Sequence, residues 1–255
     1  MKLIINADDF GLTKSVNKAI VEAMTHGVVS STTLMVNQSG TLDAVDLIAT
    51  HQLKGVGLHV NLTLGKPVSD PSDIPTLVDD SGHFHCRQYL LDNAERVNSE
   101  HVFLEAMNQY TKAIELGVAV DHVDSHHFSA FLPNVREGFI KFVNAINLPT
   151  RRADYYVRDL SLLKVKTTDR FSAEFFDEKA TLHDLKQIIS ESKNEGGMEV
   201  LEVMAHPGYS DASLAALSSY TERREQELEI LLSGALKDWL YREQIELINF
   251  EGLQQ

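Results

Sequence analysis

Short apolar runs alternate with amphipathic segments along the whole chain. The first run, Leu3–Ala7, has the length and composition of a buried strand. The next segment, Lys14–His26, carries apolar residues at helical spacing, with Thr13 placed to cap it and Gly27 to end it. The same alternation continues to the C-terminus, and it predicts a parallel sheet covered by helices.

The remaining elements follow from the same pattern. Further strands are predicted at Val28–Val36, Gly55–Leu62, Val118–Ser125, Glu199–Ala205 and Ile245–Phe250. Further helices are predicted at Leu42–Thr50, from a cap at Ser99 to Gly117, at Asn134–Ile146, from Thr181 to Asn194, and over Glu222–Leu240. Residues 65–98 and 154–180 are irregular, which is typical of loops over the mouth of an active site.

The first and last predicted strands are both apolar, as central strands are. This favours closure into a complete or distorted barrel over an open, doubly wound sheet. No linker, repeat or low-complexity tract divides the 255 residues, so we expect one domain over residues 1–255.

Composition and charge exclude several classes of function. With 43% hydrophobic and 24% charged residues, the chain resembles ordinary globular proteins. Its net charge of −14 disfavours binding to nucleic acid or to anionic membranes. The apolar N-terminal run is too short for a signal peptide, and no stretch approaches the roughly 20 apolar residues of a membrane span. A cytoplasmic protein is expected, and the single Cys86 suits a reducing compartment.

Acidic and histidine residues follow four of the predicted strands. These residues are Asp8, Asp9, His59, Asp124, His126 and His206. Because β/α folds assemble their active sites at the carboxyl ends of parallel strands, we expect them to meet in one site.

Asp9, His59 and His126 have the composition of a divalent metal site. One carboxylate and two imidazoles leave positions open for a water and a substrate oxygen, which is a hydrolytic arrangement. The ion lowers the pKa of the water towards ~7, and a nearby carboxylate accepts its proton. Asp8 is the predicted base, and His206, neutral or protonated, is the predicted acid for the leaving nitrogen.

Strand alternation also assigns supporting residues. Asp124 and His126 face the same way along their strand, so Asp124 is expected to contact a metal ligand. The role of His127 stays open between such a contact and ordinary packing.

The neighbours Asp8 and Asp9 would face opposite sides of a regular strand. Both reach one site only if the chain turns there, which Phe10-Gly11 permits.

Five segments resemble the YdjC-like carbohydrate deacetylases, which include the chito-oligosaccharide deacetylases. They are Asn6-Ala-Asp-Asp-Phe-Gly11, Ser30-Ser-Thr-Thr33, Gly57-Leu-His59, His122-Val-Asp-Ser-His-His127 and Glu202-Val-Met-Ala-His-Pro207. The resemblance implies a single-domain distorted (β/α) barrel, TIM-barrel-like and of the polysaccharide-deacetylase type. It also implies hydrolysis of an acetamido sugar to the free amine and acetate, a metal at Asp9, His59 and His126, and a homodimer.

Looser analogy with polysaccharide deacetylases supports Asp8 as the base and His206 as the acid, with Arg151 or Arg152 orienting the base. Residues 128–130 depart from the family, because chito-oligosaccharide deacetylases tend to have further histidines there. The departure leaves the identity of the acetylated sugar open.

The metal and the reaction class have alternatives. Imidazole ligands favour Zn²⁺ or a similar transition metal, whereas the family is commonly described with Mg²⁺. Another metal-assisted barrel enzyme, such as a sugar isomerase or an amidohydrolase, would use the same fold, and so would a non-catalytic sugar-binding module. An isomerase would require more carboxylates around paired metals, and a pure binder would not need Asp8 and His206.

Overall fold

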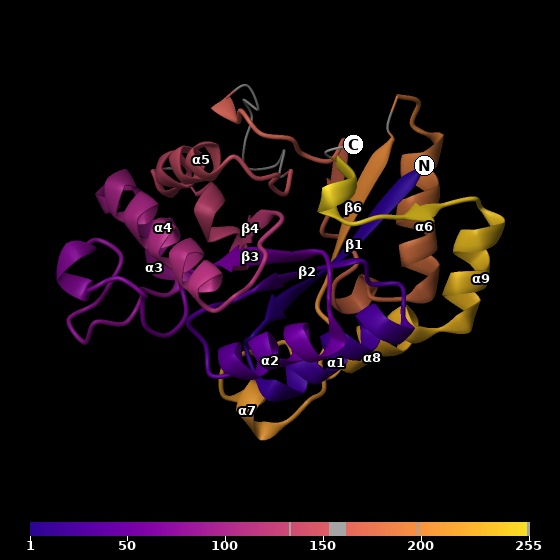
Figure 1. Ribbon diagram of the computed structural model, residues 1–255, viewed down its shortest axis with the longest axis horizontal. Coiled ribbons are helices and arrows are strands. Elements are labelled where there is room, and N and C mark those ends of the chain that lie inside the picture. Colours follow the sequence, from indigo (N-terminus) through magenta and orange to yellow (C-terminus); the bar gives the residue numbers. More distant parts are fainter. Residues whose placement is uncertain (133, 153–161, 198, 254–255) are drawn as a thin grey trace.

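A parallel sheet forms the centre of the computed structural model, which describes residues 1–132, 134–152, 162–197 and 199–253 (Figure 1). Its strands follow the order β4-β3-β2-β1-β6-β5, and β7 pairs with the start of β1. The strands are β1 (Lys2–Phe10), β2 (Ser31–Leu34), β3 (Val56–Val60), β4 (Val123–Ser125), β5 (Arg170–Ser172), β6 (Val200–Ala205) and β7 (Glu246–Leu247). All their pairings are parallel, so the carboxyl ends of the strands lie along one edge.

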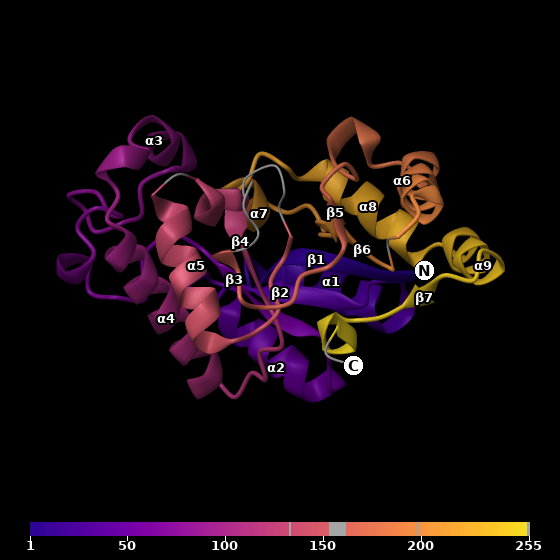
Figure 2. The same ribbon diagram turned by 90° about the horizontal axis from the view of Figure 1, so that it is seen from above.

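Helices cover the sheet and extend past both of its ends. They are α1 (Lys14–His26), α2 (Thr41–His51), α3 (Arg87–Asp92), α4 (Ser99–Glu115), α5 (Val135–Ile146), α6 (Leu182–Asn194), α7 (Ala212–Ala215), α8 (Glu222–Leu232) and α9 (Gly234–Arg242). Helices α4 and α5 pack together beside β3 and β4, whereas α6 and α9 lie at the opposite end (Figures 1 and 2). Helix α1 contacts both α2 and α8, and its buried Val16, Ala19 and Ile20 join the apolar core.

The alternation of strands and helices predicted from the sequence is confirmed, and so is the α/β fold. Strands β4 and β5 end the strand order, and no pairing between them occurs in the described part of the chain. The sheet therefore forms a distorted, incomplete barrel, which is one of the two forms, complete or distorted, that the sequence predicted. No helix among the described residues is long and apolar enough to cross a membrane.

Several predicted boundaries are wrong for local reasons. The long helix predicted over Glu222–Leu240 is broken, because Ser233 is extended (φ −66°, ψ 133°) and its hydroxyl accepts a hydrogen bond from Leu236 N to start α9. Asn98, not Ser99, caps α4, since its side chain accepts from Glu100 N.

The ends of the sheet hold the other differences. Of the strand predicted over Ile245–Phe250, only Glu246–Leu247 forms a strand in the described structure, as β7. Residues Phe250–Leu253 form a 3₁₀ turn. Strand β5 and the short helices α3 and α7 were not predicted. All three are only three to six residues long, too short to show a clear period.

Candidate active site

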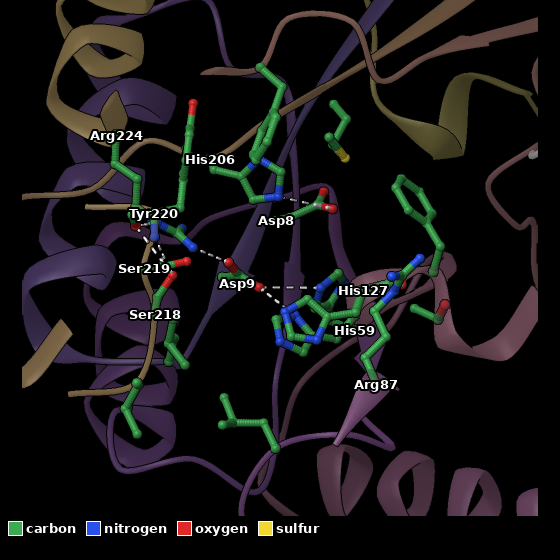
Figure 3. Close-up of a pocket in the computed structure, with 18 of the residues that line it drawn as sticks. Asp8, Asp9, His59, Arg87, His127, His206, Ser218, Ser219, Tyr220 and Arg224 are labelled. Atoms are coloured by element: carbon green, nitrogen blue, oxygen red, sulfur yellow. Dashed lines mark hydrogen bonds and ion pairs between the residues drawn. The ribbon is translucent and has the colours of Figure 1, made fainter. Parts of the chain in front are cut away.

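A pocket of about 540 Å³ opens at the carboxyl edge of the sheet (Figure 3). Its lining includes five of the residues that the sequence pattern singled out, and those are Asp8, Asp9, His59, His126 and His206. They come from the ends of β1, β3 and β6 and from the 3₁₀ segment that follows β4. The structure thus brings together groups that are up to about two hundred residues apart in the sequence.

Asp8 and Asp9 both reach the pocket because β1 is irregular at its end. Asp9 has a φ of 71°, which is uncommon for a residue other than glycine, and the β1–β2 register shifts between Ala7 and Phe10. The chain therefore changes direction at Asp9, and Gly11 also has a positive φ, of 90°. Gly11 accommodates the chain just beyond, since a Cβ there would lie 2.6 Å from the Met35 carbonyl oxygen.

Asp9, His59 and His126 converge on one point. Oδ1 of Asp9 lies 2.9 Å from Nδ1 of His126 and 3.4 Å from Nε2 of His59, and all three side chains are almost completely buried. Despite this proximity, Asp9 Oδ1 has no hydrogen-bond partner within the described residues. An unpartnered buried carboxylate oxygen facing two imidazoles fits a divalent cation, because the ion would satisfy all three groups at once.

His59 is held by Asp124, as strand alternation suggested. Its Nδ1 lies 2.6 Å from Asp124 Oδ1, so its Nε2 is the nitrogen that faces Asp9. Burial lowers the pKa of His59, but the Asp124 carboxylate outweighs burial and raises that pKa to about 10.

Arg151 binds three buried carboxylates. It donates from Nη1 and Nη2 to the two oxygens of Asp8 at 2.8 and 2.7 Å, and from Nε to Glu202 at 2.7 Å. Its Nη1 also lies 2.9 Å from Asp124 Oδ2. Burial raises the pKa of Asp8, but Arg151 outweighs burial and lowers it to about 2. Of the two arginines considered, Arg151 is the one that holds Asp8.

A second acidic cluster, formed by Asp8, His59 and Asp124, is less suited to a cation. Arg151 already supplies a positive charge to both of its carboxylates. The fit to a metal is therefore better at Asp9.

His206 follows β6 and faces Asp8 across the pocket (Figure 3). Its Nε2 lies 4.0 Å from Asp8 Oδ2, its Nδ1 has no partner among the described residues, and its backbone N–H donates to Glu227. Burial lowers the pKa of His206 to about 4, so its imidazole is neutral at pH 7. The sequence had left its charge open.

His127 packs against the ring of His126, with a centroid separation of 3.7 Å. It has a φ of 56°, its Nδ1 lies 3.1 Å from the Thr63 hydroxyl, and its carbonyl accepts a hydrogen bond from Arg87. Burial and the neighbouring His126 lower the pKa of His127 to about 3. It therefore contacts His126, one of the three predicted metal ligands.

The N-terminal part of α8 supplies residues that sequence reasoning missed. Although residues 222–229 are rich in charged side chains, Arg224 is only 3% exposed and donates to Asp9 Oδ2 at 2.6 Å. Glu227 is fully buried and accepts from His206 N and from the Tyr220 hydroxyl. A signal was present, because Arg224 and Glu227 share the helical face of the buried Leu228 and Leu231.

Comparisons with known proteins cover nearly the whole chain. A family model described as YdjC-like protein matches residues 2–242. A protein of Brevibacillus brevis described as a carbohydrate deacetylase is 36% identical over 255 residues, which are 99% of this chain and 100% of the relative. A crystal structure from Enterococcus faecalis, described as a cellobiose-phosphate cleavage protein, has a TM-score of 0.92 and 32% identity, and the match covers 99% of this chain and 98% of that one.

A more distant solved structure shares the fold alone. A peptidoglycan N-acetylglucosamine deacetylase has a TM-score of 0.52 at 10% identity, and the match covers 99% of this chain and 87% of that one.

Proposed function

The chain belongs to the YdjC-like protein family, and from this membership we propose that it is a hydrolase that removes acetyl groups from N-acetylated sugars. The observation that carries the proposal is the unpartnered Asp9 Oδ1 facing His59 and His126, beside Asp8 and His206 in one pocket. Relatives named as carbohydrate deacetylases support the same reaction.

Asp9, His59 and His126 are the residues that would hold a divalent ion. Two imidazoles favour Zn²⁺ or a similar transition metal, and Mg²⁺ is the alternative that the family resemblance implies. Such an ion supplies a Lewis acid for the acetyl carbonyl and makes a nearby water easier to deprotonate.

Asp8 acts as the proton acceptor in this proposal. Its pKa of about 2 keeps it ionised at neutral pH, and Arg151 fixes both of its oxygens. A group with so low a pKa holds a proton only briefly, so it must pass the proton on.

His206 is placed to receive that proton. It is neutral at pH 7, and its Nε2 lies 4.0 Å from Asp8 Oδ2. When this distance shortens to hydrogen-bond length in the substrate complex, His206 can take up the proton and then deliver it to the leaving nitrogen. The proton lost by the attacking water thus ends on the amine, and the acetyl group leaves as acetate.

The other walls of the pocket suit a sugar. Apolar side chains of the lining can pack against an acetyl methyl group and the face of a sugar ring. These side chains belong to Leu12, Leu64, Phe128, Ala173, Phe176, Met204 and Leu217. Ser218, Ser219 and Tyr220 line one side of the pocket and offer polar groups for hydroxyls (Figure 3).

Cleavage of a glycosidic bond, as the description of the Enterococcus faecalis relative suggests, fits the pocket less well. Most glycosidases need a protonated carboxyl group at the leaving oxygen. Burial raises the pKa of a carboxyl, but Arg151 lowers that of Asp8 to about 2 and Arg224 holds that of Asp9 well below its ordinary value. Neither carboxyl group carries a proton at neutral pH.

Acetate release from a panel of N-acetylated mono- and oligosaccharides tests the proposal. We expect release from at least one sugar, loss of release after chelation, and its return when Zn²⁺ or Mg²⁺ is added. Cellobiose phosphate serves as the comparison substrate. Glucose release from it, with no acetate from any metal-loaded assay, would reject deacetylation.

A further inference from the structure

The two oxygens of Asp9 have different surroundings. Oδ1 faces His59 and His126, whereas Oδ2 accepts a hydrogen bond from Nη2 of Arg224 at 2.6 Å. Figure 3 shows Arg224 and His59 approaching Asp9 from opposite sides. One oxygen is therefore directed at the candidate metal position, and the other is occupied by a cation of the chain.

Arg224 is fixed in this position by several contacts. Its Nε donates to the Tyr220 carbonyl at 2.9 Å, and its aliphatic stem packs on Gly208, where an added Cβ would lie 3.0 Å from Arg224 Cδ. The side chain is only 3% exposed. These contacts hold the guanidinium against Asp9 Oδ2.

We propose that Arg224 is a positioning residue that limits Asp9 to one-oxygen metal ligation and keeps the metal affinity of the site lower than its three ligands alone would give. The inference rests on the metal site proposed above. A carboxylate can ligate a cation through one or both oxygens, and Arg224 occupies the second one. The ion would keep a coordination position open for the substrate.

The charge of Arg224 acts in the same direction. A buried guanidinium bound to a metal ligand repels a divalent cation, and this repulsion is weakly screened in a buried site. Its removal also leaves Asp9 with an unpaired buried charge, which a cation would neutralise. Loss of Arg224 should therefore tighten metal binding, whereas loss of a merely structural residue would weaken it.

The test compares chelator-stripped wild type with Arg224→Gln and Arg223→Gln. Arg223 is a matched control, because it lies on the same helix but is 43% exposed and pairs with Asp177 at 3.6 Å. Titration with Zn²⁺ should give a dissociation constant about ten- to a hundredfold lower for Arg224→Gln than for wild type. Arg223→Gln should match wild type.

Two further readouts keep the test decisive. With Co²⁺ as the probe, the visible absorption of Arg224→Gln should weaken, since it falls as coordination number rises. If Arg224→Gln does not fold without metal, Arg224→Met serves instead, because its side chain can pack on Gly208. The Tm of Arg224→Met should rise more on Zn²⁺ addition than that of wild type.

Equal or weaker Zn²⁺ binding in the folded variant would overturn the inference. Failure of wild type to bind any divalent ion would instead reject the metal site.

Discussion

Replacement of His206 by alanine separates proton delivery to a leaving group from the other steps of hydrolysis. An amine leaves a tetrahedral intermediate only when it is protonated, whereas the phenolate of an activated ester needs no proton. His206→Ala should therefore lose most deacetylation of N-acetyl sugars, and it should keep a larger fraction of its activity on an aryl acetate.

The size of the effect follows from the contacts of the ring. The Nδ1 of His206 has no partner among the described residues, and its Nε2 is 4.0 Å from Asp8, too far for a hydrogen bond. Within the described part of the chain, its ring contacts are edge contacts with Phe176 and Tyr220, so its removal should cost no more than about 1 kcal/mol of stability. Loss of a positioned acid should lower amide turnover by roughly 10²–10⁴-fold, about 3–5 kcal/mol of barrier.

The assay measures kcat/KM for acetate release from an N-acetyl sugar and for hydrolysis of 4-nitrophenyl acetate, alongside metal content and Tm. His183→Ala, an exposed histidine on α6, is the control and should match wild type in all four measurements. Equal losses on both substrates together with a fall in metal content would refute the reasoning. His206 would then be a ligand or a structural support, and His127 would be the next candidate for the acid.

Three further outcomes test the remaining assignments. Elemental analysis should find a divalent ion in wild type and a large loss in His59→Ala and His126→Ala; equal content in all three would exclude these ligands. Asp8→Asn should keep most of its metal but lose turnover by roughly 10²–10⁴-fold, and full activity would remove Asp8 from the mechanism. Burial raises the pKa of Glu227 from 4.5 to about 7, so the folded state retains a proton that the unfolded chain loses, and stability falls as pH rises between these values. In denaturant titrations, the free energy of unfolding should fall over this pH range by about 3 kcal/mol less in Glu227→Gln than in wild type. An equal fall in both proteins would contradict the assignment of this pH dependence to Glu227.

Local sequence determined most of the architecture. Helix α1 has the predicted bounds, with Thr13 as its cap, because spacing and capping act over a few residues. The parallel sheet followed from the alternation of elements, and its carboxyl edge brought Asp9, His59 and His126 together. Placement at strand ends was enough to find these groups, since it depends only on strand order and direction.

Only the tertiary structure decided how these groups are held and charged. Asp9 and Arg224 are 215 residues apart, and their contact depends on how α8 packs against the sheet, which no local period encodes. The same is true of Arg151 and Asp8, 143 residues apart. Protonation is equally non-local, because burial and surrounding charges make His206 neutral and keep Asp8 ionised. The sequence could name the reactive groups, but their electrostatic state depends on the packing of distant segments around them.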